Sequence, residues 1–334
     1  MEERREESRD DESPYLVSLE ELEPSPESSS DVLLDLESGT YSPGTEGAPV
    51  DKVHGAPRPS TLRLGLGGRG WDYWLSTLQK YSTYPPSLFF VLHITNTSLI
   101  PLATRSLSSS EPYLLLTRPI YQSPGLEPIL LTIPVLTHIA SGVALRVLRQ
   151  SRRARRSGAE TREQRRSLTP WLRPSLQARL GYMLVPLLGA HVLVNRITPL
   201  IVEGGSSGVG LGFVAHGIAR RPLIMRVWYV SLTGIAVWHF VGGWARWMGW
   251  GSVAAESGPR RGSKVMYLGS EEGMKEMRGR RRRRWIIRGL AAAGTVLWLS
   301  GGMGVIGRAG MGSGWEARNW DELYRQVPAL GRFL

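Results

Sequence analysis

The stretch LEPILLTIPVLTHIASGVALRVL, residues 126–148, is long and apolar enough to cross a lipid bilayer. A bilayer core of about 30 Å requires roughly 20 mainly apolar residues in a helix. Four other segments share this character, at residues 86–104, 178–201, 223–248 and 286–307. Their prolines and glycines are compatible with membrane helices, because neighbouring helices satisfy the freed backbone groups. The sequence therefore predicts an all-α integral membrane protein, a bundle of about five transmembrane helices.

The N-terminal part of the chain differs from the rest in composition. Residues 1–51 carry 16 acidic and 3 basic side chains, whereas the remainder carries 38 basic and 13 acidic ones. Glu, Ser, Pro and Asp dominate this part, and such a segment buries too little apolar surface to offset the entropy lost on ordering. We therefore expect a disordered acidic tail over residues 1–70, a five-span transmembrane domain over 71–310 and a short C-terminal tail over 311–334.

The basic residues are unevenly distributed among the connections between spans. Nine arginines lie in residues 149–177, and ten basic residues lie in 249–285, five of them in the run Arg280 to Arg284. The other two connections carry two basic residues each. Since cytoplasmic loops carry an excess of Lys and Arg, we expect the N-terminus and both basic loops in the cytosol and the C-terminus on the opposite side. Binding of anionic lipids is an alternative role for the basic runs.

Composition also excludes several function classes. The chain has no cysteine, which excludes disulfides, thiolate zinc sites and cysteine nucleophiles. Its Gly-x-Ser-x-Gly match, GGSSG at 204–208, lies in a glycine-rich connector without the strand–helix context of a nucleophile elbow, and no paired acid–base arrangement is found, so we expect no enzymatic activity. Nucleic-acid binding is disfavoured because the basic runs lack interleaved aromatic residues. The acidic N-terminus resembles neither a signal peptide nor a mitochondrial presequence, which favours insertion by the internal spans into the endoplasmic reticulum or the mitochondrial outer membrane.

Four of the six histidines lie in the expected spans, one in each of the first four: His93, His138, His191 and His239. An imidazole in hydrocarbon is costly and should face the bundle interior. There it either forms an interhelical hydrogen bond or, paired with a second histidine at the same depth, ligates haem b. Counted from the cytosolic ends at about 1.5 Å per residue, His138 and His239 match in depth, whereas His93 and His191 differ by about 10 Å. Apart from the iron of this candidate haem, we expect the protein to bind no metal ion.

Several other polar residues lie within or beside the spans. Arg196 stands near the far end of the third span, where it either extends to the interface or pairs with Glu203. Thr95, Asn96 and Asn195 lie within spans as well. Together with Arg196 they could line a groove along which lipid headgroups cross the bilayer. A phospholipid scramblase is therefore an alternative function.

Three stretches resemble the transmembrane domain of the fungal mitochondrial adapter protein family. They are LQKYSTYPPSLFFVLHITNTSLIPL (78–102), GYMLVPLLGAHVLVNRITPLIVEGGSSGVGLGFVAHG (181–217) and VWYVSLTGIAVWHFVGGWARWMGW (227–250). The resemblance covers about residues 72–310. It implies a multi-pass protein of the mitochondrial outer membrane, with a cytosolic N-terminus and its C-terminus in the intermembrane space. It also implies recruitment of a chorein-type, bridge-like lipid-transfer protein to organelle contact sites, in support of mitochondrial lipid homeostasis. The family's helical domain is similar to the haem-carrying membrane anchors of fumarate reductase and succinate dehydrogenase.

The same family binds its partner through a tail motif in which apolar residues lead into Pro-x-Pro. The matching residues here, in SLEELEPSP, are Leu19, Leu22, Pro24 and Pro26. Pro-x-Pro pre-orders an extended segment, which lowers the entropy lost on docking, and the leucines supply apolar anchors. The segment DVLLDL at 31–36 is a competing anchor. The expected partners are thus the lipid-transfer protein and membrane lipids.

Overall fold

The structure, a computed structural model, describes residues 70–156, 158, 161, 163–164, 175–250 and 271–334. These described residues form helices and contain no strand, which confirms the expected all-α class. Five helical stretches are long and apolar enough to cross a membrane: Trp71–Thr104, Pro128–Arg152, Leu176–Glu203, Pro222–Trp250 and Met277–Arg308. The acidic tail over residues 1–69 lies outside the described residues.

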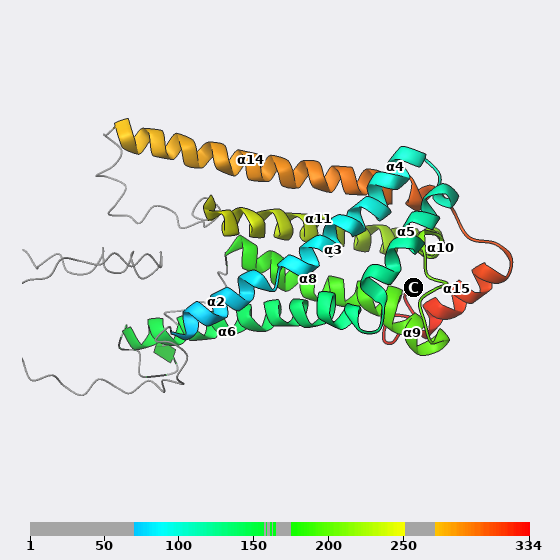
Figure 1. Cartoon of the computed structure of the whole chain (residues 1–334), viewed down its shortest axis with the longest axis horizontal. Helices are drawn as coiled ribbons and strands as arrows, with labels where there is room; N and C mark the ends of the chain where they lie inside the picture. Colours follow the sequence, from blue (N-terminus) through cyan, green and yellow to red (C-terminus); the bar gives the residue numbers. More distant parts are fainter. Residues whose placement is uncertain (1–69, 157, 159–160, 162, 165–174, 251–270) are drawn as a thin grey trace, which may run out of the picture. The chain divides into compact units, whose positions relative to one another are not determined.

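The spans are built from helical elements joined end to end (Figure 1). In chain order, the five spans comprise α2 (Trp71–Tyr81), α3 (Tyr84–Ile94), η1 (Thr95–Leu99) and α4 (Ile100–Thr104); η2 (Pro128–Thr132) and α6 (Ile133–Arg156); α8 (Leu176–Val192), η3 (Leu193–Ile197) and α9 (Thr198–Glu203); α11 (Pro222–Ala245) and η4 (Arg246–Trp250); and α14 (Glu271–Gly302). The elements η1 to η4 are π-helical turns. Four further elements lie at the end of the bundle opposite the arginine-rich segments: α5 (Leu107–Gln122), α10 (Leu211–Arg220), η5 (Ile306–Arg308) and α15 (Gly314–Gln326).

The outward-facing side chains of the spans are apolar. Leu88 is 64% exposed, Leu223 77% and Val296 64%. Soluble proteins rarely leave extended apolar surface open to water. Hydrocarbon is therefore the medium that suits the outer faces of these helices.

The buried core, by contrast, lies at the end opposite the arginine-rich segments. Phe213 and Ile218 of α10 are completely buried, and Leu323 and Tyr324 of α15 are 1% exposed. The rings of Phe213 and Tyr324 stack with centroids 4.4 Å apart. Residues 311–334, expected as a short tail, instead contain a helix docked into this core, because one face of α15 carries large apolar side chains.

Close contact between the first and fifth spans depends on a glycine in α14. A Cβ atom at Gly301 would lie 2.3 Å from the backbone oxygen of Ser98. The Ser98 side chain is fully buried, and its hydroxyl donates to the backbone oxygen of Leu297 at 2.8 Å. Small residues let membrane helices approach closely, and Gly301 serves this purpose here.

Two of the π-helical turns, η1 and η3, follow the same local pattern. A proline lies two residues after each turn, and proline has no N–H to continue the helical hydrogen bonds. Asn96 and Asn195 each donate to the carbonyl oxygen four residues earlier, at 3.0 and 2.9 Å. These side chains satisfy backbone groups in a membrane segment where water is absent. The turns begin two residues after His93 and His191, which lie in the last turns of α3 and α8.

The fifth helix extends beyond the length that a bilayer requires. The run Arg280–Arg284, expected in a loop, lies within α14 (Figure 1). At 1.5 Å per residue its 32 residues measure about 48 Å, against about 30 Å for the hydrocarbon core. Trp285 follows the arginines and is 63% exposed, which is typical of a residue at the membrane interface. The arginine run therefore continues the membrane helix instead of ending it.

Candidate functional site

The four histidines of the spans form two pairs. His138 of α6 faces His239 of α11, with ring centroids 6.2 Å apart. His93 of α3 faces His191 of α8, with ring centroids 6.1 Å apart. Each pair thus joins two different spans, and together the pairs involve the first four.

The pairs lie at two depths in the bundle. A Cβ atom at Gly181 would lie 3.0 Å from Cε1 of His239, and His191 follows ten residues later on α8. At 1.5 Å per residue, the two pairs are about 15 Å apart along this helix. The expected depth match of His138 with His239 is found, but the offset between His93 and its partner was wrong. The first span begins at Trp71 and not at residue 86, so His93 lies deeper than the count placed it.

The first pair is held by polar groups of the two neighbouring spans. His138 Nδ1 lies 3.0 Å from the backbone oxygen of Gln79. Since a carbonyl oxygen only accepts, Nδ1 of His138 carries the proton and Nε2 carries the lone pair. Gln177 Nε2 donates to the backbone oxygen of His239 at 2.7 Å and lies 3.2 Å from its Nδ1. His239 therefore has the opposite tautomer, with the proton on Nε2.

The second pair has a more apolar environment. Phe89 stacks on His93 with centroids 5.1 Å apart, and Trp298 lies 5.9 Å away. Nδ1 of His93 is buried and has no hydrogen-bond partner in the described chain. His191 has one, because Asn195 Nδ2 lies 3.3 Å from its Nδ1. A buried polar atom without a hydrogen-bond partner lowers the stability of the fold by about 1–3 kcal/mol. Such an atom requires an explanation, and a functional role of His93 is one.

The two pairs can be compared with the requirements of haem b. Two imidazoles bound to one metal ion through bonds of about 2.1 Å have ring centroids roughly 6 Å apart, as both pairs do. A metal-ligating histidine usually donates its other ring N–H to a carboxylate, a carbonyl oxygen or water, and the Nδ1–H of His138 donates to a carbonyl oxygen in this way. His239 and His191 fit in position, but each would have to release an amide donor from Nδ1 before Nε2 could ligate iron. Among the described residues, no cluster of three or more His, Asp or Glu side chains is placed to hold a metal ion.

An ion pair joins the far ends of the second and third spans. Arg196 Nε donates to Glu127 at 2.8 Å, and its Nη1 donates to the hydroxyl of Ser206 at 2.7 Å. The expected pairing of Arg196 with Glu203 is therefore wrong. Glu203 instead accepts a hydrogen bond from Asn319. The pairing was predictable in principle, because Glu127 and Arg196 stand at the far-side ends of consecutive spans.

The polar residues expected to line a lipid groove are bonded within the protein. Thr95 donates to the backbone oxygen of Val91 at 2.8 Å, and Asn96 is 2% exposed. Asn195 and Arg196 make the bonds described above. These interactions account for the four side chains without a groove, and scrambling stays a prediction. Headgroup flipping in reconstituted vesicles would test it.

A carboxylate at the far end fixes the beginning of α10. Glu111 of α5 accepts hydrogen bonds from the backbone N–H of Leu211 at 2.9 Å and of Gly212 at 3.3 Å. A helix N-terminus favours a negative charge at this position. Burial raises the pKa of the Glu111 carboxyl, and the two amide hydrogen bonds oppose that rise. Glu111 thus links α5 to α10.

A histidine outside the spans holds the docked α15 helix. His216 is fully buried, and its Nδ1 accepts from the backbone N–H of Gly312 at 3.2 Å. Its Nε2–H therefore donates to Asp321 Oδ1, 3.1 Å away. This hydrogen bond holds the pKa of Asp321 below its usual range, and Arg220 beside it adds to the effect. His216 is one of the two histidines outside the expected spans, and its role is not visible in the sequence because its partners lie about a hundred residues away.

The membrane-spanning part of the chain is similar to a known protein family. A family model described as "MDM10-complementing protein 1, transmembrane domain" matches residues 88–172 and 186–311, well over half of the chain. The chain belongs to this family. The mitochondrial adapter protein MCP1 of Saccharomyces cerevisiae is 27% identical over 209 residues, which cover 55% of this chain. The match spans 65% of that relative, slightly less than two thirds of its length. No solved structure matches this chain significantly.

The MDM10-complementing protein 1 transmembrane domain includes both histidine pairs. The first matched segment contains His93 and His138, and the second contains His191 and His239. The match ends before α15 and begins after α2. The paired histidines therefore belong to the family domain, whereas the helices at the two extremes of the described chain lie outside it.

The partner motif expected in the tail lies outside both the matched and the described residues. It consists of Leu19, Leu22, Pro24 and Pro26. Recruitment through this motif stays a prediction for this member of the MDM10-complementing protein 1 family.

Proposed function

We propose that the protein is a mitochondrial outer-membrane adapter whose tail recruits a chorein-type, bridge-like lipid-transfer protein to organelle contact sites. The observation that carries this proposal is membership of the MDM10-complementing protein 1 transmembrane-domain family, with a relative named as a mitochondrial adapter protein. In this proposal the protein supports mitochondrial lipid homeostasis through recruitment and carries out no reaction of its own.

The arrangement of the described chain supports an anchoring role. Five spans with apolar outer faces hold the protein in a bilayer. The start of α2, where the tail leaves the bundle, lies beside the arginine-bearing end of α6, because Asp72 pairs with Arg149 and Arg152. By the positive-inside rule this end faces the cytosol, so the tail would reach a cytosolic partner and the C-terminus would face the intermembrane space.

Alanine substitution in the tail tests the proposal. Replacing Leu22, Pro24 and Pro26 together should abolish recruitment of the lipid-transfer protein to mitochondria, while mitochondrial targeting of the variant stays intact. The matched variant replaces Leu33 and Leu34 in the competing apolar segment and should recruit normally. If the second variant loses recruitment and the first keeps it, the motif is assigned to the wrong segment. If both recruit normally, the adapter proposal for this tail fails.

A second candidate function, haem b binding, is favoured by the two histidine pairs. His138 with His239, and His93 with His191, would hold the iron of one haem each. Haem would supply one-electron chemistry or structural support. The protein's own contribution is to orient the imidazoles and to exclude water with the rings around His93.

The absorption spectrum of the purified full chain tests haem binding. A reduced-minus-oxidised difference spectrum should show b-type bands, and His138→Ala and His93→Ala should each remove part of the signal. His54→Ala, in the tail, is the matched control and should leave the spectrum unchanged. A featureless spectrum of the protein purified from haem-replete cells would reject this function while leaving the adapter proposal standing.

A further inference from the structure

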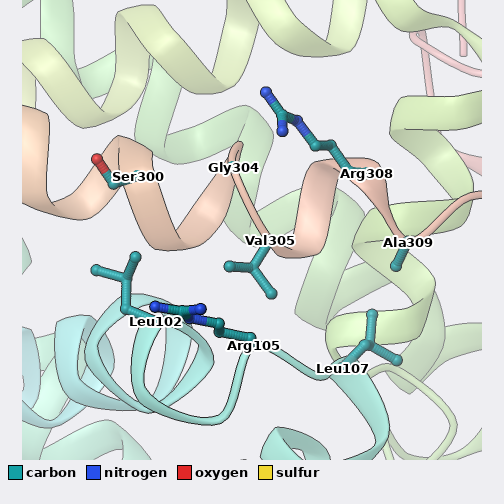
Figure 2. A pocket seen from close by; sticks show the side chains of 8 residues that line it. All are labelled: Leu102, Arg105, Leu107, Ser300, Gly304, Val305, Arg308 and Ala309. Atoms are coloured by element: carbon teal, nitrogen blue, oxygen red, sulfur yellow. The ribbon is translucent and has the colours of Figure 1, made fainter.

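A cavity of about 610 Å³ opens between the far ends of the first and fifth spans. Figure 2 shows its two walls. One wall carries Leu102, Arg105 and Leu107, and the other carries Ser300, Gly304, Val305, Arg308 and Ala309. The Arg105 side chain extends along the gap toward Leu102, whereas the Arg308 side chain points away from the wall that carries Arg105. The cavity thus combines the Arg105 guanidinium with an apolar lining, and Arg308 adds a second positive charge at its rim.

Neither guanidinium group of the two cavity arginines has a hydrogen bond or ion pair within the described chain. The carboxylates identified above at this end of the bundle bind elsewhere: Glu111 binds the first amides of α10, Glu127 binds Arg196, and Asp321 binds His216 and Arg220. A guanidinium presents five N–H donors in a planar fork that matches phosphate oxygens. The cavity therefore offers donors that the described protein does not use.

The backbone of Arg105 is in a conformation that normally favours glycine. Its φ of 51° places it in the left-handed region, where it ends α4 and donates its N–H to the backbone oxygen of Pro101 at 2.8 Å. Glycine occupies this helix-ending position most often because a side chain there is strained. Backbone strain of this kind is often found at functional sites. It therefore suggests that the Arg105 side chain has a function.

The location of the cavity indicates which kind of anion it binds. It lies beside the end of α4 and beside η5, which completes the fifth apolar helical stretch at Arg308. Because the first and fifth apolar stretches end here, we infer that the cavity stands at the level of the membrane interface. Loops on this side carry few basic residues, so two arginines at one cavity are not explained by topology. Leu102, Leu107 and Val305 suit a glycerol backbone and the beginning of acyl chains. Ligand pockets of about 300–1,000 Å³ hold molecules the size of one such headgroup.

We propose that this cavity binds the phosphate headgroup of one anionic glycerophospholipid in the leaflet opposite the arginine-rich segments. Arg105 is the main phosphate ligand, since its side chain lies along the cavity, and Arg308 provides additional charge. The site is independent of partner recruitment by the tail and of the histidine pairs, so it can be tested on its own.

Site-resolved photo-crosslinking on the full chain tests the proposal. The purified protein is reconstituted in phosphatidylcholine nanodiscs that contain a photoactivatable phosphatidylglycerol, and the labelled peptides are mapped. The wild type should be labelled at the segments that carry Leu107 and Val305. Arg105→Gln should lower this labelling about tenfold, the typical loss of a charge-assisted hydrogen bond. Arg308→Gln should lower it about threefold, as for an exposed ion pair.

Three further variants distinguish the effects of charge, of cavity volume and of misfolding on the labelling. Arg318→Gln, an exposed arginine at the same end, is the matched control and should leave labelling unchanged. Leu107→Trp should reduce labelling by filling the cavity without changing charge. Arg105→Gly should reduce labelling as Arg105→Gln does while keeping or raising the melting temperature, because glycine suits the backbone conformation of this position. This variant keeps the test decisive if Arg105→Gln fails to fold.

Competition identifies the source of the phosphate. Excess inorganic phosphate should leave the cavity labelling unchanged, because it lacks the apolar part of the lipid. Loss of labelling at the cavity, with labelling of the basic cytosolic segments retained, would assign the site to free phosphate and overturn the lipid proposal. Equal labelling by a phosphatidylcholine probe, or unchanged labelling in both Arg105 variants, would overturn it as well.

Discussion

The substitution Gly301→Ala is expected to separate the first and fifth spans. The added Cβ would lie 2.3 Å from the backbone oxygen of Ser98 and 2.4 Å from its Cα, so backbone atoms must move. Overpacking typically costs about 1–3 kcal/mol. The shift would also break the buried hydrogen bond from Ser98 to Leu297, at about 1 kcal/mol. At about 2–4 °C per kcal/mol for a domain of this size, the apparent melting temperature should fall by roughly 5–15 °C.

The matched control for this prediction is Gly289→Ala on the same helix. A Cβ at Gly289 meets nothing within 4 Å, and alanine is the better helix former by about 1 kcal/mol, so the melting temperature should stay or rise slightly. Ser98→Ala alone should cost only the hydrogen bond and should not rescue Gly301→Ala, because the contact is with backbone. Thermal unfolding of the detergent-purified protein, followed by tryptophan fluorescence, measures all three. Equal melting temperatures for the two glycine variants would refute the close-contact argument.

Two charged groups at the far end of the bundle support further predictions. Asp321→Asn should loosen α15 by about 1 kcal/mol after allowance for solvent screening, seen as faster hydrogen exchange in that helix. Because the folded pKa of Asp321 is lowered, the wild type should have this stabilisation fully above pH about 4 and lose it as the pH falls further, whereas the variant should lack this pH dependence. Glu127→Gln should destabilise by about 2 kcal/mol, since Arg196 is only 18% exposed and would lose its counter-charge. A double-mutant cycle with Arg196→Gln should show a coupling of at least about 0.5 kcal/mol, and additive effects would contradict the ion pair.

The membrane spans were predictable because hydrophobic length is a local property of the sequence. The segment at 126–148 and its four counterparts each correspond to a long apolar helix. Pairing of His138 with His239 was predictable as well, since both stand a similar number of residues from their cytosolic ends. The depth of His93 was not, because α2 and α3 continue one span across residues 82–83 and the sequence there is rich in polar and aromatic groups.

The far end of the bundle was not predictable from local patterns. α5, α10 and α15 are too short or too polar to be read as spans, and their stability depends on contacts between distant residues. His216 and Asp321 are about a hundred residues apart, and so are Glu111 and Leu211. No periodicity within α15 indicates which surface its Trp320 and Tyr324 side chains fill. The candidate cavity beside Arg105 was not predictable for the same reason, because its two walls are about 200 residues apart in the sequence.

The length of α14 bears on how near another membrane can come to this one. If Trp285 marks the bilayer surface, the residues from Glu271 to Trp285 form a rigid pole about 20 Å tall above the headgroups. Five consecutive arginines on a helix point in all directions around its axis, since successive residues turn by about 100°. Such a pole would act as a positively charged spacer and not as a docking stripe, setting a minimum gap that any tethered protein has to span.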